Sequence, residues 1–596
     1  MAEIADEKLM ALARQIAQTL GPNNSATDDI LSILSNSDAK PRESFSDDGG
    51  GVDHTLKSLD RRISRYISSA ASIWLNPRNS ASFLDAVDQL IAVVREWNPI
   101  ADRDNISTSL DRAEDLLQQS MYRLEDEFRA LIERGWSTAD HSDYSDEDLD
   151  DDVSVDGVDF IPVARPMTDY KLVVDALPER TAEDLNDIAK RMVAAGYMKE
   201  CSGVYSTCRR DFLVQSFSRL GLQKLTGDDL QSMPWSQVED EIEKWSKGIT
   251  VAAQILFPSE LRLCDRVFYG FPSAVDLSFA EVCRDSTIQL LNFADEVAIV
   301  SRIPDRLFKL LDVYEAVRDL IPQFELIFSR DHSFSLIDEA VAVRRRVGDV
   351  IRVIFLELEN SIRRDVAKSA IPGGGLHPIN RYMMNYLRAA CSSRQTLEQV
   401  FEESDGKGDE RGLSPLAIQL TWMMELLENN LESKSKLYRG DTALCCVFMI
   451  NNLSYMLQKV KDNEMGAVLG GNWIKKHTAK VRQYHVTYQK SSWSKVLDVL
   501  SVDNSSHGTT TKILREKLKL FNSYFEETCK TQSTWVIFNE ELCEEFTVSV
   551  SETVSEAYSG FIQRFGKHGD RHIKYSVEDI EALIDDLFRG MCSGKR

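Results

Sequence analysis

The sequence predicts an all-α protein, an elongated rod of stacked helical bundles that follow an N-terminal coiled-coil-like helical region. Only 15 prolines and 29 glycines occur in 596 residues, and both residue types interrupt helices. Helical periodicity recurs along most of the chain, whereas no β-branched alternation is long enough to build a sheet. The length exceeds what one hydrophobic core needs, so we expect several structural units in succession.

Residues 1–135 are expected to form a helical, coiled-coil-like assembly region. One helix is expected over residues 4–20, a Gly/Ser/Asp-rich break interrupts residues 21–54, and helical periodicity resumes near Leu56 and again over residues 82–97. The strongest pattern has apolar residues at alternating spacings of four and three, typical of a coiled-coil seam: Leu117, Met121, Leu124, Phe128 and Leu131. Two heptads also fit an ordinary bundle helix, whose partner would lie in this chain or in a neighbour.

An acidic, disordered linker is expected over residues 136–166. Six of the seven residues from Asp146 to Asp152 are acidic, so this stretch repels itself and offers nothing to a core. A calcium loop that begins at Asp152 is rejected because its twelfth position is Val163 rather than Glu. Phe160 and Val163 fit the aromatic-x-x-aliphatic short motif that autophagy adaptors accept; the alternative is a linker that anchors its end to the rod.

From residue 167 onward, helices follow one another with short breaks. We expect the first bundles of the rod over residues 167–400 and the C-terminal bundles over residues 401–596. Capping-box spacings predict that helices begin at Thr181 and Ser576. The stretch "PGGGLHP" (372–378) is glycine-rich but lacks the Lys-Ser/Thr of a phosphate loop, so we interpret it as a turn before a helix.

The motifs of common enzyme and metal sites are missing from the sequence. It contains no GxxxxGK[ST], GxGxxG, GxSxG or HExxH motif. His568 and His572 have the spacing of neighbours on a helix, but glycines interrupt the segment and no third ligand is apparent, which favours a solvated basic loop. We therefore predict no catalytic residue, no metal and no cofactor, and do not expect an enzyme.

Composition also bounds the location and the partners. The formal net charge of −25 argues against a nucleic-acid partner, which would need a dominant positive field. The chain shows no secretory signal and no run of about 18 apolar residues, and its ten cysteines form no regular framework. We expect a cytoplasmic protein with reduced thiols, whose contact with a membrane would be peripheral.

Cations nevertheless gather in the last quarter of the chain. Residues 472–495 contain no acid and six cations that form an additional candidate basic surface: Lys475, Lys476, Lys480, Arg482, Lys490 and Lys495. Four aromatic residues lie between them and are expected to belong to the core: Trp473, Tyr484, Tyr488 and Trp493. The stretch "TKILREKLK" (511–519) follows, and residues 564–574 form a third basic tract. Such a concentration predicts an anionic partner, either nucleic acid or a membrane.

Several segments together resemble one protein family. These are "LFPSELRLCDRVF" (256–268), "GLHPINRYMMNYLRAAC" (375–391), "VFMINNLSYML" (447–457) and "RHIKYSVEDIEALIDDLF" (571–588). In this order they resemble the seventy-kilodalton subunit of the exocyst, in its plant-type form. The resemblance extends from about residue 167 to residue 590.

The resemblance implies a rod with an N-terminal assembly helix that tethers secretory vesicles to the plasma membrane before fusion. It implies other exocyst subunits as partners and an anionic phosphoinositide membrane bound through basic residues at the C-terminal tip. Arg571 and Lys574 occupy the basic positions of the family's closing motif, in which His572 replaces an aromatic residue. Lys567 and Arg564 precede it in a loop that varies within the family.

The resemblance also carries further expectations and one alternative. It implies a cytoplasmic chain recruited peripherally to the plasma membrane and vesicles, with roles in plant defence and autophagy-related transport. Small GTPases, autophagy adaptors and immune regulators are the further partner classes. The alternative is a soluble helical scaffold or adaptor that recruits proteins and binds lipid weakly or not at all.

Overall fold

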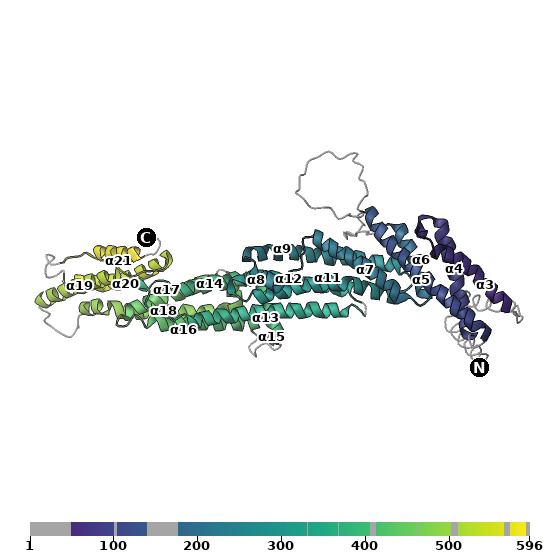
Figure 1. Cartoon of the computed structure of the whole chain (residues 1–596). Helices are drawn as coiled ribbons and strands as arrows, with labels where there is room; N and C mark the ends of the chain where they lie inside the picture. The colour runs from purple at the N-terminus through teal and green to yellow at the C-terminus, as the bar shows by residue number, and fades with distance from the viewer. Residues whose placement is uncertain are drawn as a thin grey trace, which may run out of the picture. The chain divides into compact units, whose positions relative to one another are not determined.

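The structure is a computed structural model of the whole chain. It describes residues 49–100, 104–139, 177–329, 332–366, 369–405, 413–461, 463–501, 511–565 and 573–591. Within these ranges the regular elements are helices, and no strand occurs among them (Figure 1). The prediction of an all-α protein is therefore confirmed.

The chain divides into two compact units. The first comprises Met1–Ala130 with Lys190–Tyr197, and the second comprises Leu131–Ala189 with Met198–Arg596. The described elements of the first unit are α3 (Gly49–Ile67), η1 (Ile73–Leu75), α4 (Pro77–Trp97), η2 (Asn98–Ile100) and most of α5 (Asp104–Ala139). The helix expected over residues 4–20 lies outside the described residues, as does the linker from residue 140 onward.

The apolar seam of α5 is buried within this chain. All five of its predicted residues are buried. Arg112 of α5 donates to Asp60 of α3 at 2.6 Å. Farther along α5, the buried carboxylate of Glu127 accepts from the Ser72 hydroxyl (2.6 Å) and from the Ile73 N–H (2.8 Å) at the start of η1. The partner that the sequence left open is thus found in the same chain.

The second unit contains two successive sets of helices. The first set is α6 (Glu179–Ala194), whose last residues belong to the first unit, α7 (Met198–Arg219), α8 (Gly227–Ser232), α9 (Trp235–Val251), the π-helical turn η3 (Ala252–Leu256), α10 (Phe257–Val267), α11 (Pro272–Val300), η4 (Pro304–Arg306), α12 (Leu307–Ile327) and α13 (Phe334–Arg364). The second set is η5 (Pro372–Gly374), α14 (Pro378–Ala390), η6 (Cys391–Ser393), α15 (Arg394–Asp405), α16 (Pro415–Ser435), α17 (Thr442–Lys461), α18 (Glu464–Leu500), α19 (Thr511–Gln532), α20 (Glu540–Phe565) and α21 (Val577–Met591).

Shared helices join these sets into a succession of bundles. Helix α11 contacts α7 and α13, and α13 also contacts α15 and α16. Helix α17 packs along α18, which in turn contacts α19 and α20, and α20 carries α21 (Figure 1). The last helices therefore form one continuous bundle that begins with α17.

One of the two predicted helix starts is confirmed. At α21 the Ser576 N–H donates to Asp579 Oδ2 (2.8 Å) and the Asp579 N–H donates to Ser576 Oγ (3.0 Å), which completes a capping box. The predicted start at Thr181 is wrong, since α6 begins at Glu179. The Pro178 carbonyl already accepts the N–H of residue 182, so the first helical hydrogen bond forms before Thr181.

Helix α17 fixes the glycine-rich turn before α14. The buried side chain of Asn451 donates to the carbonyls of Gly374 and Val536, each at 2.7 Å, and accepts from the Phe538 N–H at 3.1 Å. Gly373 has a φ of 66°, and a Cβ there would lie 2.9 Å from a backbone oxygen. The prediction of a turn before a helix is confirmed, and the turn is bound to two distant segments.

A buried ion pair crosses the first set of helices. Arg209 of α7 donates to Glu260 of α10 at 2.7 Å, and both side chains are almost fully buried. The Tyr205 hydroxyl donates to the same carboxylate at 2.7 Å and accepts from the Cys264 thiol at 3.4 Å. Burial raises the pKa of Tyr205 well above its ordinary value, so its hydroxyl remains a donor.

The remaining expectations concern thiols, metals and membrane spans. Eight cysteines in the described ranges are outside any disulfide, whereas Cys543 is disulfide-bonded, which differs from the expectation of reduced thiols. Among the described residues, no cluster of three His, Cys, Asp or Glu side chains is placed to hold a metal ion. Likewise, no helix in the described part of the chain combines the length and the apolar character needed to cross a membrane.

Candidate functional site

The C-terminal bundle brings several helix ends to one place. Tyr488 of α18 donates to Gln532 of α19 (2.8 Å), while Lys517 of α19 donates to the Ser501 carbonyl after α18 (2.6 Å). The pairs run in opposite order along the two helices, so α18 and α19 are antiparallel. The end of α18 therefore lies beside the beginning of α19.

The end of α20 lies at the same place. Phe521 of α19 stacks on Tyr558 of α20 with ring centroids 4.7 Å apart. Because the short segment 533–539 joins the end of α19 to the start of α20, the two helices run in opposite directions. We call this end of the bundle the tip and define it as residues 495–501, 511–521, 558–565 and 573–579 (Figure 1).

Lys574 lies at the tip beside one acid and one tyrosine. Its Nζ lies 2.5 Å from Glu526 Oε1 of α19, and the Tyr575 hydroxyl donates to the same oxygen at 3.0 Å. The Tyr558 hydroxyl donates to the Tyr575 carbonyl at 2.7 Å, which fixes the backbone just before α21. The sequence-predicted cation therefore sits on an ordered segment.

The ion pair leaves Lys574 accessible. The Lys574 side chain is 54% exposed and that of Glu526 is 48% exposed. Hydrogen bonding to Lys574 lowers the pKa of Glu526, and the same hydrogen bond raises the pKa of Lys574, so both groups are charged at neutral pH. Exposed pairs contribute little stability. An external anion can therefore replace Glu526 at small cost.

The other predicted residues of this site fall outside what the structure describes. Lys567 and Arg571 lie in the segment 566–572, and Arg564 lies in the last turn of α20, where only the backbone is described. The two described ends of that segment, at the close of α20 and before α21, are both at the tip. Phe160 and Val163 also lie outside the described residues.

The aromatic residues between the cations of α18 belong to the core, as predicted. Trp473, Tyr488 and Trp493 are buried, and Tyr484 is half-buried. The Trp493 indole packs against Phe525 of α19 with ring centroids 6.1 Å apart. These side chains pack α18 into the bundle and are not on the surface to contact a ligand.

One of the six predicted cations of α18 is engaged inside the bundle. Lys480 lies 2.6 Å from Glu428 and 2.5 Å from Glu432, both on α16. Burial opposes ionisation of Glu428, but hydrogen bonds from His477 and Lys480 prevail and lower its pKa to about 2. Lys480 therefore stabilises the contact between α16 and α18.

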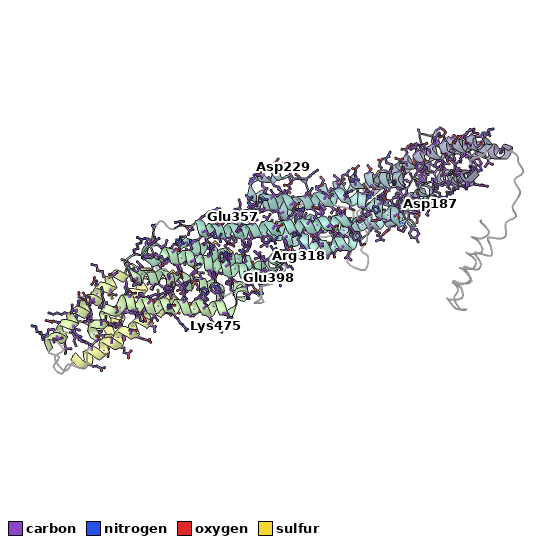
Figure 2. The ribbon with its side chains drawn as sticks, turned by 90° about the horizontal axis from the view of Figure 1, so that it is seen from below. Asp187, Asp229, Arg318, Glu357, Glu398 and Lys475 are labelled. Carbon is purple, nitrogen blue, oxygen red and sulfur yellow. The ribbon has the colours of Figure 1, made fainter. Side chains whose placement is uncertain are left out.

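The other five cations of α18 are exposed but do not form one surface with the tip. They are Lys475, Lys476, Arg482, Lys490 and Lys495. At 1.5 Å per residue, Lys475 lies about 37 Å along the helix from Leu500, and Figure 2 shows it well away from the yellow C-terminal helices. Of these five, Lys495 lies within the tip, and Lys490 is the next nearest, about 7 Å from it along the helix.

The structure also draws attention to cations that the sequence did not single out. Lys512, Arg515 and Lys519 are exposed on the first turns of α19, within the tip. The stretch "TKILREKLK" signalled them, but the sequence could not show which of its residues face solvent.

Comparison with known proteins places this architecture in a family. A model described as the C-terminal part of the Exo70 exocyst complex subunit matches residues 243–586, and a model of the N-terminal part of the exocyst complex component Exo70 matches residues 55–134. The chain belongs to the Exo70 family. The predicted resemblance is thus confirmed, and the family implies assembly with other exocyst subunits.

Relatives of this Exo70 chain include plant proteins that match it along nearly their whole length. The exocyst complex component EXO70B1 of Arabidopsis thaliana is 53% identical, with all of both chains covered. EXO70B2 of the same plant is 48% identical, with 99% of each chain covered. The plant-type form of the resemblance is likewise confirmed.

Solved structures support the fold alone. The Exo70 structure of S. cerevisiae covers 90% of this chain and 99% of its own length, with a TM-score of 0.61 at 12% identity. A structure described together with the Exo84p C-terminal domains gives a TM-score of 0.60 at 13% identity. Arg571 and Lys574 lie within the part of the chain that the C-terminal family model matches, whereas Phe160 and Val163 lie between the two matched regions.

Proposed function

We propose that this Exo70 subunit tethers secretory vesicles to the plasma membrane before fusion. In this proposal it assembles with other exocyst subunits in the cytoplasm, and its tip binds anionic phosphoinositides through Arg571, Lys574, Lys567 and Arg564. The observation that carries the proposal is Lys574, an exposed cation on an ordered segment whose only acidic partner is a replaceable surface carboxylate, among the described residues.

Electrostatics indicate which part of the chain faces the lipid. The chain carries a formal net charge of −25, so an anionic leaflet repels most of its surface and attracts its basic end. Each cation near such a leaflet contributes about 1 kcal/mol, so four contribute about 4 kcal/mol. That corresponds to roughly millimolar affinity. The tip alone is therefore a weak contact, and several such contacts within one exocyst complex supply the avidity.

The tip can be tested by flotation of the full-length protein on vesicles of phosphatidylcholine with 5% phosphatidylinositol 4,5-bisphosphate. Arg571→Ala/Lys574→Ala should weaken binding about 30-fold, because two contributions of about 1 kcal/mol are lost. Binding of the wild type should also weaken as salt rises. A double variant that floats as well as the wild type overturns the assignment.

Two controls separate position from total charge. Lys475→Ala/Lys476→Ala removes the same charge from the far part of α18, so its effect should be small if the tip is the contact. Glu526→Gln removes the acid beside Lys574 and should strengthen binding. If all three variants simply follow net charge, the contact is diffuse and has no defined tip.

The competing function is a helical adaptor that recruits proteins and stays off the membrane, including in plant defence or autophagy-related transport. The short motif at Phe160 and Val163, beside the acidic run, is the feature that favours it. The flotation result discriminates between the two, because an adaptor of this kind does not float with phosphoinositide vesicles.

A further inference from the structure

The first turns of α19 expose two aliphatic side chains on one line. Ile513 and Leu520 are each 47% exposed. They are seven residues apart, close to two full turns, so they share a face of the helix. Large aliphatic residues at this exposure, repeated on one face, form an apolar strip rather than a single exposed side chain.

Cations border this strip. Around the helix, Lys517, which donates to the Ser501 carbonyl, lies next to the strip on one side, and Glu516 lies next to it on the other. Lys512 and Lys519 are exposed beyond Glu516, and Arg515 is exposed still farther round the helix. Glu516 is the single acid in the stretch 512–520. The strip therefore lies within a surface whose local charge is opposite to that of the chain.

The exposed strip is separate from the face of α19 that packs in the core. Another side of α19, about a third of a turn from the strip, carries Leu514, Leu518, Phe521 and Phe525, all buried. Phe525 stacks on Phe521 and contacts Tyr575 before α21. Helix α19 is thus docked by one face, while Ile513 and Leu520 remain on the other.

The bordering cations are available to a ligand. Within the described ranges, no carboxylate lies at ion-pair distance from Lys512, Arg515 or Lys519. Lys574, in contrast, is paired with Glu526. A ligand that contacts the start of α19 would therefore displace no protein anion that the structure describes.

The strip lies at the same end of the bundle as the described ends of the basic tract 564–574. Phe521 is level with Tyr558, and α19 and α20 run in opposite directions. Residue 514, seven positions before Phe521, is thus level with Phe565, seven positions after Tyr558, where α20 ends. Both are about 10 Å farther toward the end of the bundle than the Phe521–Tyr558 contact.

We propose that the beginning of α19 is a second membrane-contact element, in which Ile513 and Leu520 enter the interface of an anionic bilayer while Lys512 and Lys519 contact lipid phosphates. This inference rests on the proposed function and adds an apolar component to it. A helix with aliphatic residues between long basic side chains suits the boundary between lipid headgroups and acyl chains. The aliphatic residues can enter the apolar layer, while the flexible stems of the basic side chains let their charges stay with the phosphates.

A bilayer fits this surface better than a protein partner does. A stable protein interface buries about 800 Å² on each side and is centred on aromatic or arginine anchors in pockets. The strip offers two aliphatic side chains and no aromatic residue, flanked mainly by lysines. Charge complementarity therefore points to an extended anionic surface.

The first test compares flotation of full-length variants on phosphoinositide vesicles and on phosphatidylserine vesicles of equal charge. Ile513→Ser/Leu520→Ser should bind both about tenfold more weakly than the wild type and lose the binding that persists in 0.5 M salt. Because both residues are exposed, the thermal midpoint should not change. Wild-type binding by this variant overturns the inference.

The second test measures insertion directly. Tryptophan emission is recorded for Ile513→Trp with vesicles that contain lipids brominated along the acyl chains. The extra emission of Ile513→Trp over the wild type comes from the new tryptophan, and the brominated lipids should quench it. Val548→Trp places a tryptophan at an exposed apolar position on α20, and its extra emission should not be quenched. Equal quenching at both positions, or at neither, contradicts insertion by α19.

The outcomes separate this inference from the proposed function. If Arg571→Ala/Lys574→Ala loses binding while Ile513→Ser/Leu520→Ser does not, the tip assignment stands and the α19 inference falls. If Ile513→Trp is quenched while the Arg571/Lys574 double variant binds normally, α19 is the contact and the proposed residues are wrong. If Ile513→Ser/Leu520→Ser changes only co-purification with other exocyst subunits, the strip is a protein interface and the inference is overturned.

Discussion

Glu260→Gln should lower the free energy of unfolding of the second unit by about 3–5 kcal/mol, because it leaves a buried charge without its partner. In the native protein Glu260 neutralises Arg209 at 2.7 Å and accepts from Tyr205. Burial favours loss of the Arg209 charge, but Glu260 outweighs it and raises the pKa of that guanidinium. The shift of the urea midpoint of the full-length protein measures the effect.

The neighbouring residue supplies a matched control. Arg210 pairs with Glu281 at 3.5 Å, where both side chains are partly exposed to solvent. Glu281→Gln should therefore change the free energy of unfolding by less than about 0.5 kcal/mol. Similar midpoints for Glu260→Gln and Glu281→Gln would show that burial of the Arg209–Glu260 pair does not decide its contribution.

Asn451→Ala should cost about 3 kcal/mol, the second-largest expected effect. It removes the amide that donates to the carbonyls of Gly374 and Val536 and accepts from the N–H of Phe538. Alanine cannot replace these hydrogen bonds, so the three backbone groups lose this partner. The turn before α14 and the segment before α20 should loosen together. Urea unfolding gives the energy, and hydrogen exchange at both segments gives the location.

An asparagine on the surface provides the reference for this change. Asn429 is exposed on α16, so Asn429→Ala should alter stability by less than about 0.5 kcal/mol. If Asn451→Ala behaves like Asn429→Ala, or if exchange rises at only one of the two segments, the amide does not join them.

Local patterns in the sequence were sufficient for much of the fold. Scarce helix breakers and apolar periodicity predicted the helices, and the seam around Leu124 predicted the buried face of α5. The capping box at Ser576 was predicted because it depends on residues three apart. The start of α6 was not, since the Pro178 carbonyl rather than Thr181 begins the hydrogen bonding.

The candidate site depends more on contacts between distant residues. Composition revealed the basic tracts, but the pairing of Lys574 with Glu526 joins residues 48 positions apart. Lys480 appeared equivalent to its neighbours in the sequence, yet α16 places two acids against it. The strip of Ile513 and Leu520 became visible only when packing had settled which face of α19 is buried.

The central claim is that the tip carries the membrane contact of an exocyst subunit. The most direct measurement compares wild type and Arg571→Ala/Lys574→Ala, expressed in plant cells, for the fraction that sediments with plasma membrane and for co-purified exocyst subunits. The proposal predicts that both proteins retain the other subunits while the variant loses most of its membrane fraction. A variant that sediments with plasma membrane as fully as the wild type, with its subunits bound, would contradict it.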